Sequence, residues 1–246
     1  MPEQPGSLVV LALLILASAV LYSSVGHGGA SAYLAAMTLF GVAAEVTKPA
    51  ALVMNLGVAG VGSARFSNAN LVPWRLLLPF LAGSVPTAFL GGLVQLPTRT
   101  HRIVLGVVLL FAAVRLALPN LRGELRRPPP AAVLVAIGAA FGFVAGLTGV
   151  GGGIFLSPLL ILARWEEPRR TAGASAVFIL ANSAAGLAGH VLAGRPIPFV
   201  ALPLAAIALA GGIYGSWLGA RKLLPLTLRR LLAFVLLIAG GKLLAT

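Results

Sequence analysis

The 246-residue chain contains no cysteine and no aspartate, and only 9% of its residues are charged. Without cysteine, it forms no disulfide bond and uses no thiolate chemistry. A soluble domain carries about 25% charged residues, so this chain has too few polar side chains to cover a surface that faces water. Hydrophobic residues make up 59% of the sequence, and the mean hydropathy is +1.01. The composition predicts a protein embedded in a lipid bilayer.

Acidic side chains are few, and all of them lie in loops or at the ends of apolar stretches. Sites for Na⁺ or divalent cations usually draw on carboxylates, and proton pumps usually place a carboxylate within the membrane. We therefore expect no metal site and no cofactor. Backbone carbonyls remain available to Na⁺, so coupling to H⁺ or to Na⁺ stays open. The five acidic residues are Glu3, Glu45, Glu124, Glu166 and Glu167.

Eighteen lysines and arginines give the chain a net charge of +13. They lie in the loops between apolar stretches, which is typical of the positive cytoplasmic side of a membrane protein and not of nucleic-acid binding. No basic residue precedes the first apolar stretch, which favours a retained segment over a cleaved signal peptide. We expect a multi-pass protein of the cytoplasmic (inner) membrane with no nucleic-acid partner. Its oligomeric state is left open.

Eight apolar stretches account for nearly the whole chain, and the first stretch of each half is too long for one crossing. A helix of 34 residues would extend about 50 Å, against a hydrocarbon core of about 30 Å. Both long stretches contain a glycine cluster, which favours a break there. Thr47 and Thr171 each precede a helix of small residues and are expected as N-caps. The stretches are 8–41, 49–66, 73–95, 102–118, 131–163, 172–193, 198–220 and 230–245.

The two glycine clusters lie about 124 residues apart in similar surroundings. At this spacing Gly28 corresponds to Gly152, and Thr47 corresponds to Thr171. We interpret this as a duplication that gives one all-α membrane transport domain, 1–246, with two homologous halves. Its predicted parts are repeat 1 (8–118), a Pro-rich and basic cytoplasmic linker (119–130) and repeat 2 (131–246).

The distribution of basic residues distinguishes two topologies. If each long stretch enters the membrane, breaks at its glycines and turns back, 13 of the 18 basic residues fall on one side. If each long stretch crosses once, the best division is 10 against 8. The positive-inside rule favours the re-entrant pairs. The two halves are then oppositely oriented, as an inverted repeat with both termini outside the cell.

The glycine breaks are the predicted binding site. Unpaired backbone persists in a membrane only where it is buried in protein or lines a water-filled cavity, and two breaks in corresponding positions indicate one shared site. Helices that restart after the glycines direct their N-terminal N–H groups toward this site, which suits an anion. No residue is expected to be catalytic. The predicted substrate-binding residues are Ser24, Gly26, His27, Gly28, Gly29, Ser31, Asn55, Thr148, Gly149, Gly151, Gly152, Gly153 and Asn182.

Several polar residues have two interpretations each. His27 is ionisable and lies inside the first break, where it would add charge to an anion site, or else it is a structural histidine. Asn55 and Asn182 either contact the ligand or form interhelical hydrogen bonds. Lys48 and Arg195 fall on the side with few basic residues, where they either guide an anion or extend along the lipid.

Two segments of the second half carry a resemblance to a known family. The stretch GLTGVGGGIFLSPLL (146–160) and the following RRTAGASAVFILANSAAGLAGHVLAGRPI (169–197) are similar to the TauE/SafE family of anion transporters. The resemblance covers nearly the whole chain and implies transport, most often export, of sulfite, sulfonates or related anions. It carries Gly149, Gly151, Gly152, Gly153 and Asn182 over as site residues. The first half departs from the pattern, because His27 stands where glycine is common and no proline matches Pro158.

We therefore expect a secondary transporter that exports a small sulfur-containing oxyanion by alternating access. No Walker motif is present, so ATP coupling within this chain is not expected. A passive anion channel is the first alternative, because channels and transporters use the same site physics. An intramembrane serine hydrolase using Ser31 or Ser157 with a histidine is the second. It lacks both a G-x-S-x-G motif and an aspartate to orient the histidine, so we do not expect an enzyme.

Overall fold

The computed structural model describes residues 5–24, 26–117, 124–221 and 226–245, and its regular elements in these ranges are all α-helices, as predicted. The first half contains α1 (Pro5–Ser23), α2 (Ala30–Leu39), α3 (Ala44–Asn68), α4 (Trp74–Leu93) and α5 (Thr98–Ala117). The second half contains α6 (Ala131–Thr148), α7 (Gly153–Leu162), α8 (Pro168–Leu192), α9 (Ala201–Arg221) and α10 (Leu226–Ala245). Residues 119–123 of the predicted linker lie outside the described residues.

Both long apolar stretches are divided at their glycine clusters, which confirms the predicted breaks. In the first stretch, α1 ends at Ser23 and the ten-residue α2 begins at Ala30. In the second, α6 ends at Thr148 and the ten-residue α7 follows. Each half therefore consists of one long helix, one short helix and three further long helices.

The expected N-caps are wrong. α3 begins at Ala44 and α8 at Pro168, so Thr47 and Thr171 lie inside the first turns of their helices. A proline suits the first helical position, because its fixed φ is preorganised for the helix and its missing N–H is not needed there. The eight predicted stretches otherwise match the helices to within a few residues at most ends.

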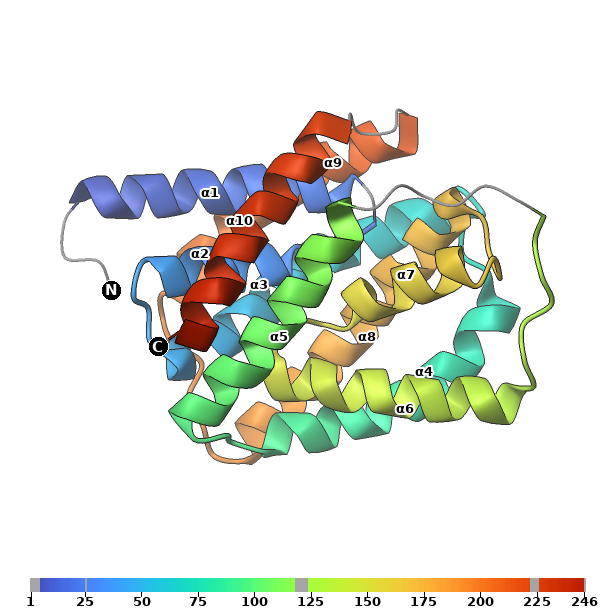
Figure 1. Ribbon diagram of the computed structural model, residues 1–246, viewed down its shortest axis with the longest axis horizontal. Helices are drawn as coiled ribbons and strands as arrows, with labels where there is room; N and C mark the ends of the chain where they lie inside the picture. Colours follow the sequence, from blue (N-terminus) through green and yellow to red (C-terminus); the bar gives the residue numbers. More distant parts are fainter. Residues whose placement is uncertain (1–4, 25, 118–123, 222–225, 246) are drawn as a thin grey trace.

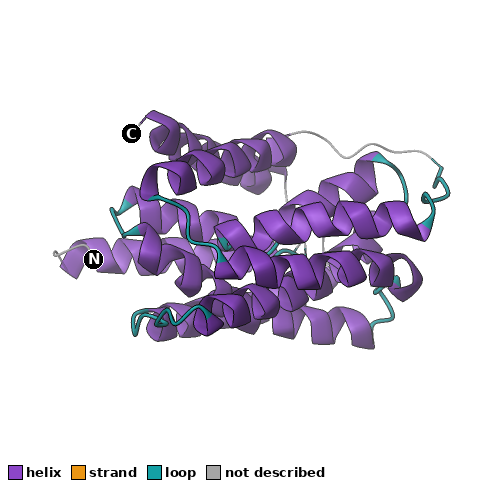
Figure 2. Cartoon of the chain, turned by 90° about the horizontal axis from the view of Figure 1, so that it is seen from below, coloured by secondary structure: helices purple, strands orange, loops and turns teal. Residues whose placement is uncertain are grey.

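The two halves pack against each other through helices in corresponding positions. α4 lies against α6 and α8, and α9 lies against α1 and α3. α3 also contacts α8, and α5 contacts α10. Figure 1 shows α1 beginning at the left of the molecule and α6 beginning at the right. Figure 2 shows the helices running beside one another, with many of the described loops near the two ends.

Glycines outside the two clusters bring these helices close together. A Cβ on Gly142 of α6 would overlap the carbonyl oxygen of Ser84 in α4. A Cβ on Gly215 of α9 would likewise overlap the carbonyl oxygen of Val20 in α1. Contacts of this kind are the usual basis of helix association in membranes, where burial of apolar surface gives little driving force.

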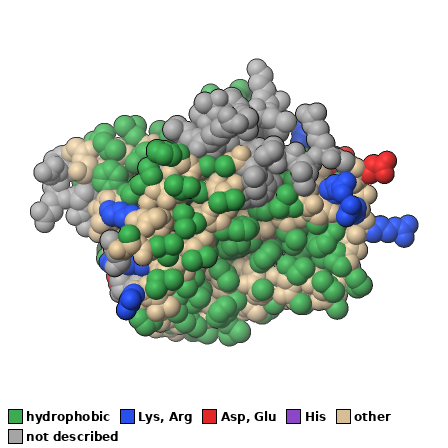
Figure 3. Space-filling model, viewed as in Figure 1, with side chains coloured by type: hydrophobic (Ala, Val, Ile, Leu, Met, Phe, Trp, Pro, Cys, Tyr) green, Lys and Arg blue, Asp and Glu red, His purple; other side chains and the backbone are tan. Residues whose placement is uncertain are grey.

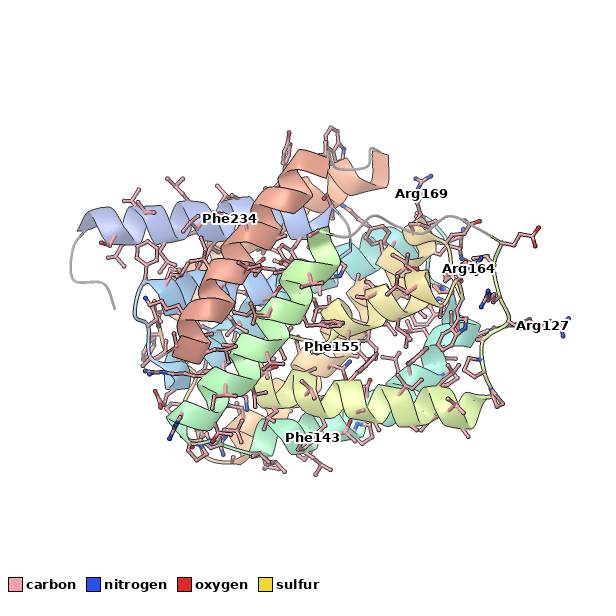
Figure 4. All side chains as sticks on the ribbon, viewed as in Figure 1. Arg127, Phe143, Phe155, Arg164, Arg169 and Phe234 are labelled. Carbon is pink, nitrogen blue, oxygen red and sulfur yellow. The ribbon has the colours of Figure 1, made fainter. Side chains whose placement is uncertain are left out.

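The outer surface is apolar between two charged ends. Hydrophobic side chains cover the middle of the face in Figure 3, and lysine and arginine side chains lie toward its ends. Five helices, α1, α4, α6, α8 and α9, are long and apolar enough to cross a membrane. Arg127, Arg164 and Arg169 gather at one end, on the right of Figure 4. This arrangement fits a chain whose sides face lipid.

Candidate functional site

The first glycine break connects α1 to α2 and packs on the second half of the chain. Gly26 has a φ of +78°, and a Cβ there would overlap the backbone of Ala172 near the start of α8. Glycine alone combines this backbone conformation with so close an approach. Gly29, with a φ of +95°, is the N-cap of α2.

The second glycine break connects α6 to α7 and packs on the first half. Gly149 has a φ of +84°, and a Cβ there would lie 3.1 Å from the carbonyl oxygen of Lys48 near the start of α3. The Thr148 hydroxyl donates to the carbonyl of Val144 at 2.7 Å and accepts the N–H of Val150 at 3.4 Å. Thr148 therefore holds the backbone of the break in place.

The two breaks meet around one pair of side chains. A Cβ on Gly28 would lie 2.5 Å from Oδ1 of Asn55 and 3.0 Å from Cγ2 of Ile179. A Cβ on Gly151 would lie 2.6 Å from Nδ2 of Asn55 and 3.0 Å from the same Cγ2. One glycine of each break, Gly28 and Gly151, is thus brought to a common centre between α3 and α8.

Corresponding positions of the two halves line this centre. The bounds of α3 and α8 differ by 124 residues, and by this spacing Asn55 corresponds to Ile179. The N-caps Gly29 and Gly152 are only 123 residues apart, because the loop between α7 and α8 has one residue more than the loop between α2 and α3. Gly28 therefore pairs in space with Gly151 and not with Gly152, a shift of one residue from the predicted pairing.

Asn55 is the fully buried polar side chain at the centre. Its Nδ2 donates to the hydroxyl of Ser183 at 3.1 Å. Its Oδ1 has no hydrogen-bond partner among the described residues. Asn182 is also fully buried, and its Nδ2 donates to the carbonyl of Phe178 in its own helix at 2.8 Å. A buried amide oxygen without a partner is costly, so Oδ1 of Asn55 is available to a donor such as a water, while its donor Nδ2 is bonded to Ser183.

The short helices α2 and α7 start at this centre without a side-chain cap. Gly29 and Gly152 cap them, and neither offers a side-chain acceptor to the first N–H groups. Ala30 and Gly153 are the first residues of the two helices. The first N–H groups of a helix have no intrahelical partner and carry a partial positive charge. Two such ends beside Asn55 make the centre suited to an anion.

The remaining predicted side chains lie around the first break. Ser24 is buried and donates to the carbonyl of Leu21 at 2.7 Å. Ser31 is buried and donates to the hydroxyl of Tyr22 at 3.1 Å. The imidazole of His27 is half-buried and lies edge-on to the Tyr22 ring, with 6.1 Å between ring centroids. Ser24 and Ser31 thus have partners within the protein.

A cavity of about 230 Å³ lies next to the second break, at the end of the molecule opposite Arg127 and Arg164. We call it the cationic cavity, because Lys48, His101, His190 and Arg195 line it. Leu147, in the last turn of α6, lines it too and connects it to Gly149 of the break.

Lys48 and His101 of the cationic cavity each lie just before the apolar stretch of their helix, 49–66 and 102–118 respectively. Burial, and secondly the nearby Arg195, lower the pKa of Lys48 to about 8. Burial, and secondly Lys48, lower the pKa of His101, and the carboxylate of Glu45 opposes this shift. Both shifts reflect positive charge crowded into a poorly solvated place.

Comparison with known proteins identifies the family. A family model described as "Sulfite exporter TauE/SafE" matches residues 10–243. The chain belongs to the TauE/SafE sulfite exporter family. It is 39% identical over 240 residues to a "Probable membrane transporter protein" of Sinorhizobium fredii, covering 95% of this chain and 97% of that one. No solved structure matches the chain.

A more distant relative matches less than half of the chain. A "Probable membrane transporter protein" of Methanocaldococcus jannaschii is 33% identical over 114 residues, which is 43% of this chain and 42% of that protein. Together with the five apolar helices, these matches establish a multi-pass membrane transporter of the TauE/SafE family.

Sequence reasoning missed two residues of the centre. Ile179 was not considered, although the 124-residue spacing from Asn55 leads directly to it. Ser183 was only a weaker candidate from the sequence, yet it is the partner of the Asn55 amide.

Proposed function

We propose that this protein is a secondary transporter that exports a small sulfur-containing oxyanion, such as sulfite or a sulfonate, across the cytoplasmic membrane. The observation that carries the proposal is the meeting of two glycine-capped helix starts at Asn55, between α3 and α8. These groups offer N–H donors and no carboxylate. The membership of the TauE/SafE family favours a sulfur oxyanion among the anions that such a centre suits.

The proposed architecture is an inverted repeat within one domain, 1–246. α1 with α2, and α6 with α7, would form re-entrant pairs that enter from opposite sides. The exchange of packing partners between α4 and α9 supports this topology, as do the opposite starting points of α1 and α6 in Figure 1. Alternating access would then follow from rocking one half against the other around the breaks. The 13 basic residues that this topology puts on the linker side support a cytoplasmic position for that side.

The alternatives are less well supported. The hydroxyls of Ser31 and Ser157 bond to Tyr22 and Ser175, which leaves neither poised as a histidine-activated nucleophile. A passive channel uses the same donors as a transporter. Accumulation of the anion against its own gradient separates the two, because a channel only dissipates a gradient.

The test is flux into proteoliposomes. We expect labelled sulfite or a small sulfonate to accumulate when an ion gradient is imposed, and acetate to be excluded. Gly151→Ala is expected to reduce this flux at least tenfold, because the new methyl group would meet the Asn55 amide in a backbone conformation with φ of +80°.

Gly194→Ala is the matched control. Gly194 has a φ of +73°, and a Cβ there would have no atom within 4 Å. It carries the same backbone strain without the contact, so its flux should stay within about twofold of the wild type. Equal loss of flux in both variants, or equal leakage of all anions through the wild type, would refute the proposal.

A further inference from the structure

The cationic cavity contains two buried histidine nitrogens without a partner. Nε2 of His101 and Nδ1 of His190 have no hydrogen-bond partner among the described residues. Both side chains line the cavity and are more than nine-tenths buried, at 6% and 4% exposure. A buried polar nitrogen without a partner costs stability. Nε2 of His101 becomes an N–H donor when the ring is protonated or takes the other tautomer. Nδ1 of His190 becomes a donor when the ring is protonated, because Nε2 donates to the carbonyl of Pro196 at 3.4 Å.

Two fixed positive charges stand in the same wall. Nζ of Lys48 donates to the carbonyls of Gly91 and Val94 at 3.3 and 3.2 Å. The guanidinium of Arg195 donates to the carbonyl of Leu93 at 2.6 Å, and more weakly to two neighbouring carbonyls. Both cations thus hold the C-terminal end of α4. The end of a helix carries only about half a negative charge, so these contacts position the two cations and offset their charge only in part.

The lining contains one carboxylate, that of the exposed Glu45. Lys48 and Arg195 outweigh it, so the cavity has an excess of one positive charge even with both histidines neutral. Its volume of about 230 Å³ has room for a tetrahedral oxyanion and several waters, since a water molecule occupies about 30 Å³. An anion would offset the crowding of cations and give both histidine nitrogens an acceptor.

Among the described residues, the positions of the opposite end that correspond to Lys48, His190 and Arg195 are apolar. By the 124-residue spacing of α3 and α8, Ala172 corresponds to Lys48 and Phe66 to His190. Leu71 stands where the same spacing places Arg195. These three residues pack together in an apolar cluster near the first break. Three of the four residues that name the cationic cavity therefore have apolar counterparts at the opposite end.

We propose that the cationic cavity is a second oxyanion site, in which Lys48 and Arg195 supply charge and His101 and His190 supply N–H donors. Its ligand is a small tetrahedral oxyanion, either free or as the phosphate of a lipid headgroup. The site is separate from the glycine centre and adjoins it through Leu147 and Gly149. Only its order along the transport path rests on the proposed function. An exported anion would reach it after leaving the centre.

The experiment measures binding of labelled sulfate to the purified full-length protein in a neutral detergent, which requires no transport. We expect Arg195→Gln and His101→Ala to weaken binding at least tenfold. His101→Ala leaves the contacts of Lys48 and Arg195 with α4 in place. Its binding can therefore be interpreted even if Arg195→Gln fails to fold. Arg99→Gln is the matched control, because Arg99 is an exposed arginine in the first turn of α5 that does not line the cavity. Its binding should stay within twofold of the wild type.

Sulfate binding in these variants and in nanodiscs tests the proposed second site. Sulfate binding that persists in Gly151→Ala but falls in His101→Ala supports a site separate from the centre, whatever the flux. Binding that is unchanged in His101→Ala and Arg195→Gln, or absent from the folded wild type, overturns the proposal. In nanodiscs, displacement of sulfate by phosphatidylglycerol from the wild type identifies a lipid headgroup as the ligand. Sulfate binding in phosphatidylglycerol nanodiscs equal to that in a neutral detergent without phosphate identifies a free anion.

Discussion

The two glycine breaks pack against different residues of the opposite half. The first break contacts a residue near the start of α8, and the second contacts a residue near the start of α3. The first break places Gly26 on Ala172, and the second places Gly149 on Lys48. Around Ala172 the chain is packed with apolar side chains, whereas around Lys48 a cavity of about 230 Å³ remains. One backbone design thus serves a closed end and an open end. The same kind of glycine break packs in two different environments.

The two ends of the molecule also face opposite sides of the membrane in the proposed topology. The closed end lies toward Arg127 and Arg164, and the open end lies toward Arg195. If the Arg-rich end is cytoplasmic, the structure has its cavity on the outside. An anion bound at Asn55 would then be closer to the side of release than to the side of uptake.

The largest expected effect concerns this orientation. The chain has no cysteine, so single cysteines can be introduced without removing any. We expect a cysteine at the exposed Ala193 to react with a membrane-impermeant maleimide added outside intact cells. A cysteine at the exposed Arg127 should react only after the membrane is permeabilised. The reverse pattern would invert the topology, and labelling of both from one side would exclude an inverted repeat.

The next effect compares the two breaks directly. An alanine in the left-handed conformation costs about 1–2 kcal/mol, and this cost applies to Gly26→Ala and to Gly149→Ala alike. At Gly26 the new methyl group would also overlap the backbone of Ala172, and overpacking of this kind adds about 1–3 kcal/mol. At Gly149 the nearest atom is 3.1 Å away. Thermal unfolding in detergent should therefore show a markedly larger loss of stability for Gly26→Ala. Equal losses would mean that the first break is not held against α8.

A smaller effect is expected at the centre, where Asn55 faces its counterpart Ile179. Asn55→Leu removes the amide and leaves the buried hydroxyl of Ser183 without this donor, a change that costs about 1–3 kcal/mol. If the amide also contacts the anion, kcat/KM for transport should fall about tenfold to a hundredfold. Ile179→Val removes one methylene at the corresponding position and should alter transport about twofold at most. Loss of stability without a change in kcat/KM would assign Asn55 a structural role alone.

The helices could be predicted because composition and length determine them. Apolar stretches of 8–41 and 131–163 exceed one crossing, and glycines are the natural places for them to break. Both breaks lie where they were expected, between Ser23 and Ala30 and after Thr148. Helix starts were less predictable, because Thr47 and Thr171 have cap-forming side chains but lie inside longer helices.

The composition of the centre could be predicted only in part. Glycine at a break is visible in a sequence, but the side chain that it touches belongs to a distant helix. Asn55 was found because a polar residue inside an apolar stretch is conspicuous. Ile179 was missed because an isoleucine there is not. The cationic cavity was also missed as a unit, since its histidines come from α5 and α8, and only the packing of α4 brings them together.

The smallest effect concerns His27, the ionisable side chain of the first break, where the second break has only glycine, valine and threonine. An imidazole changes charge across the physiological pH range, whereas a glutamine keeps a hydrogen-bonding amide and stays neutral. His27→Gln should therefore flatten the dependence of transport on pH between about 5 and 8 and leave the rate at the upper end close to that of the wild type. We expect a severalfold effect, because the half-buried ring packs on Tyr22, whereas the residues of the breaks that meet at Asn55 are Gly28 and Gly151. An unchanged pH profile would make His27 a structural residue and would assign any coupling to protons to the histidines of the cationic cavity.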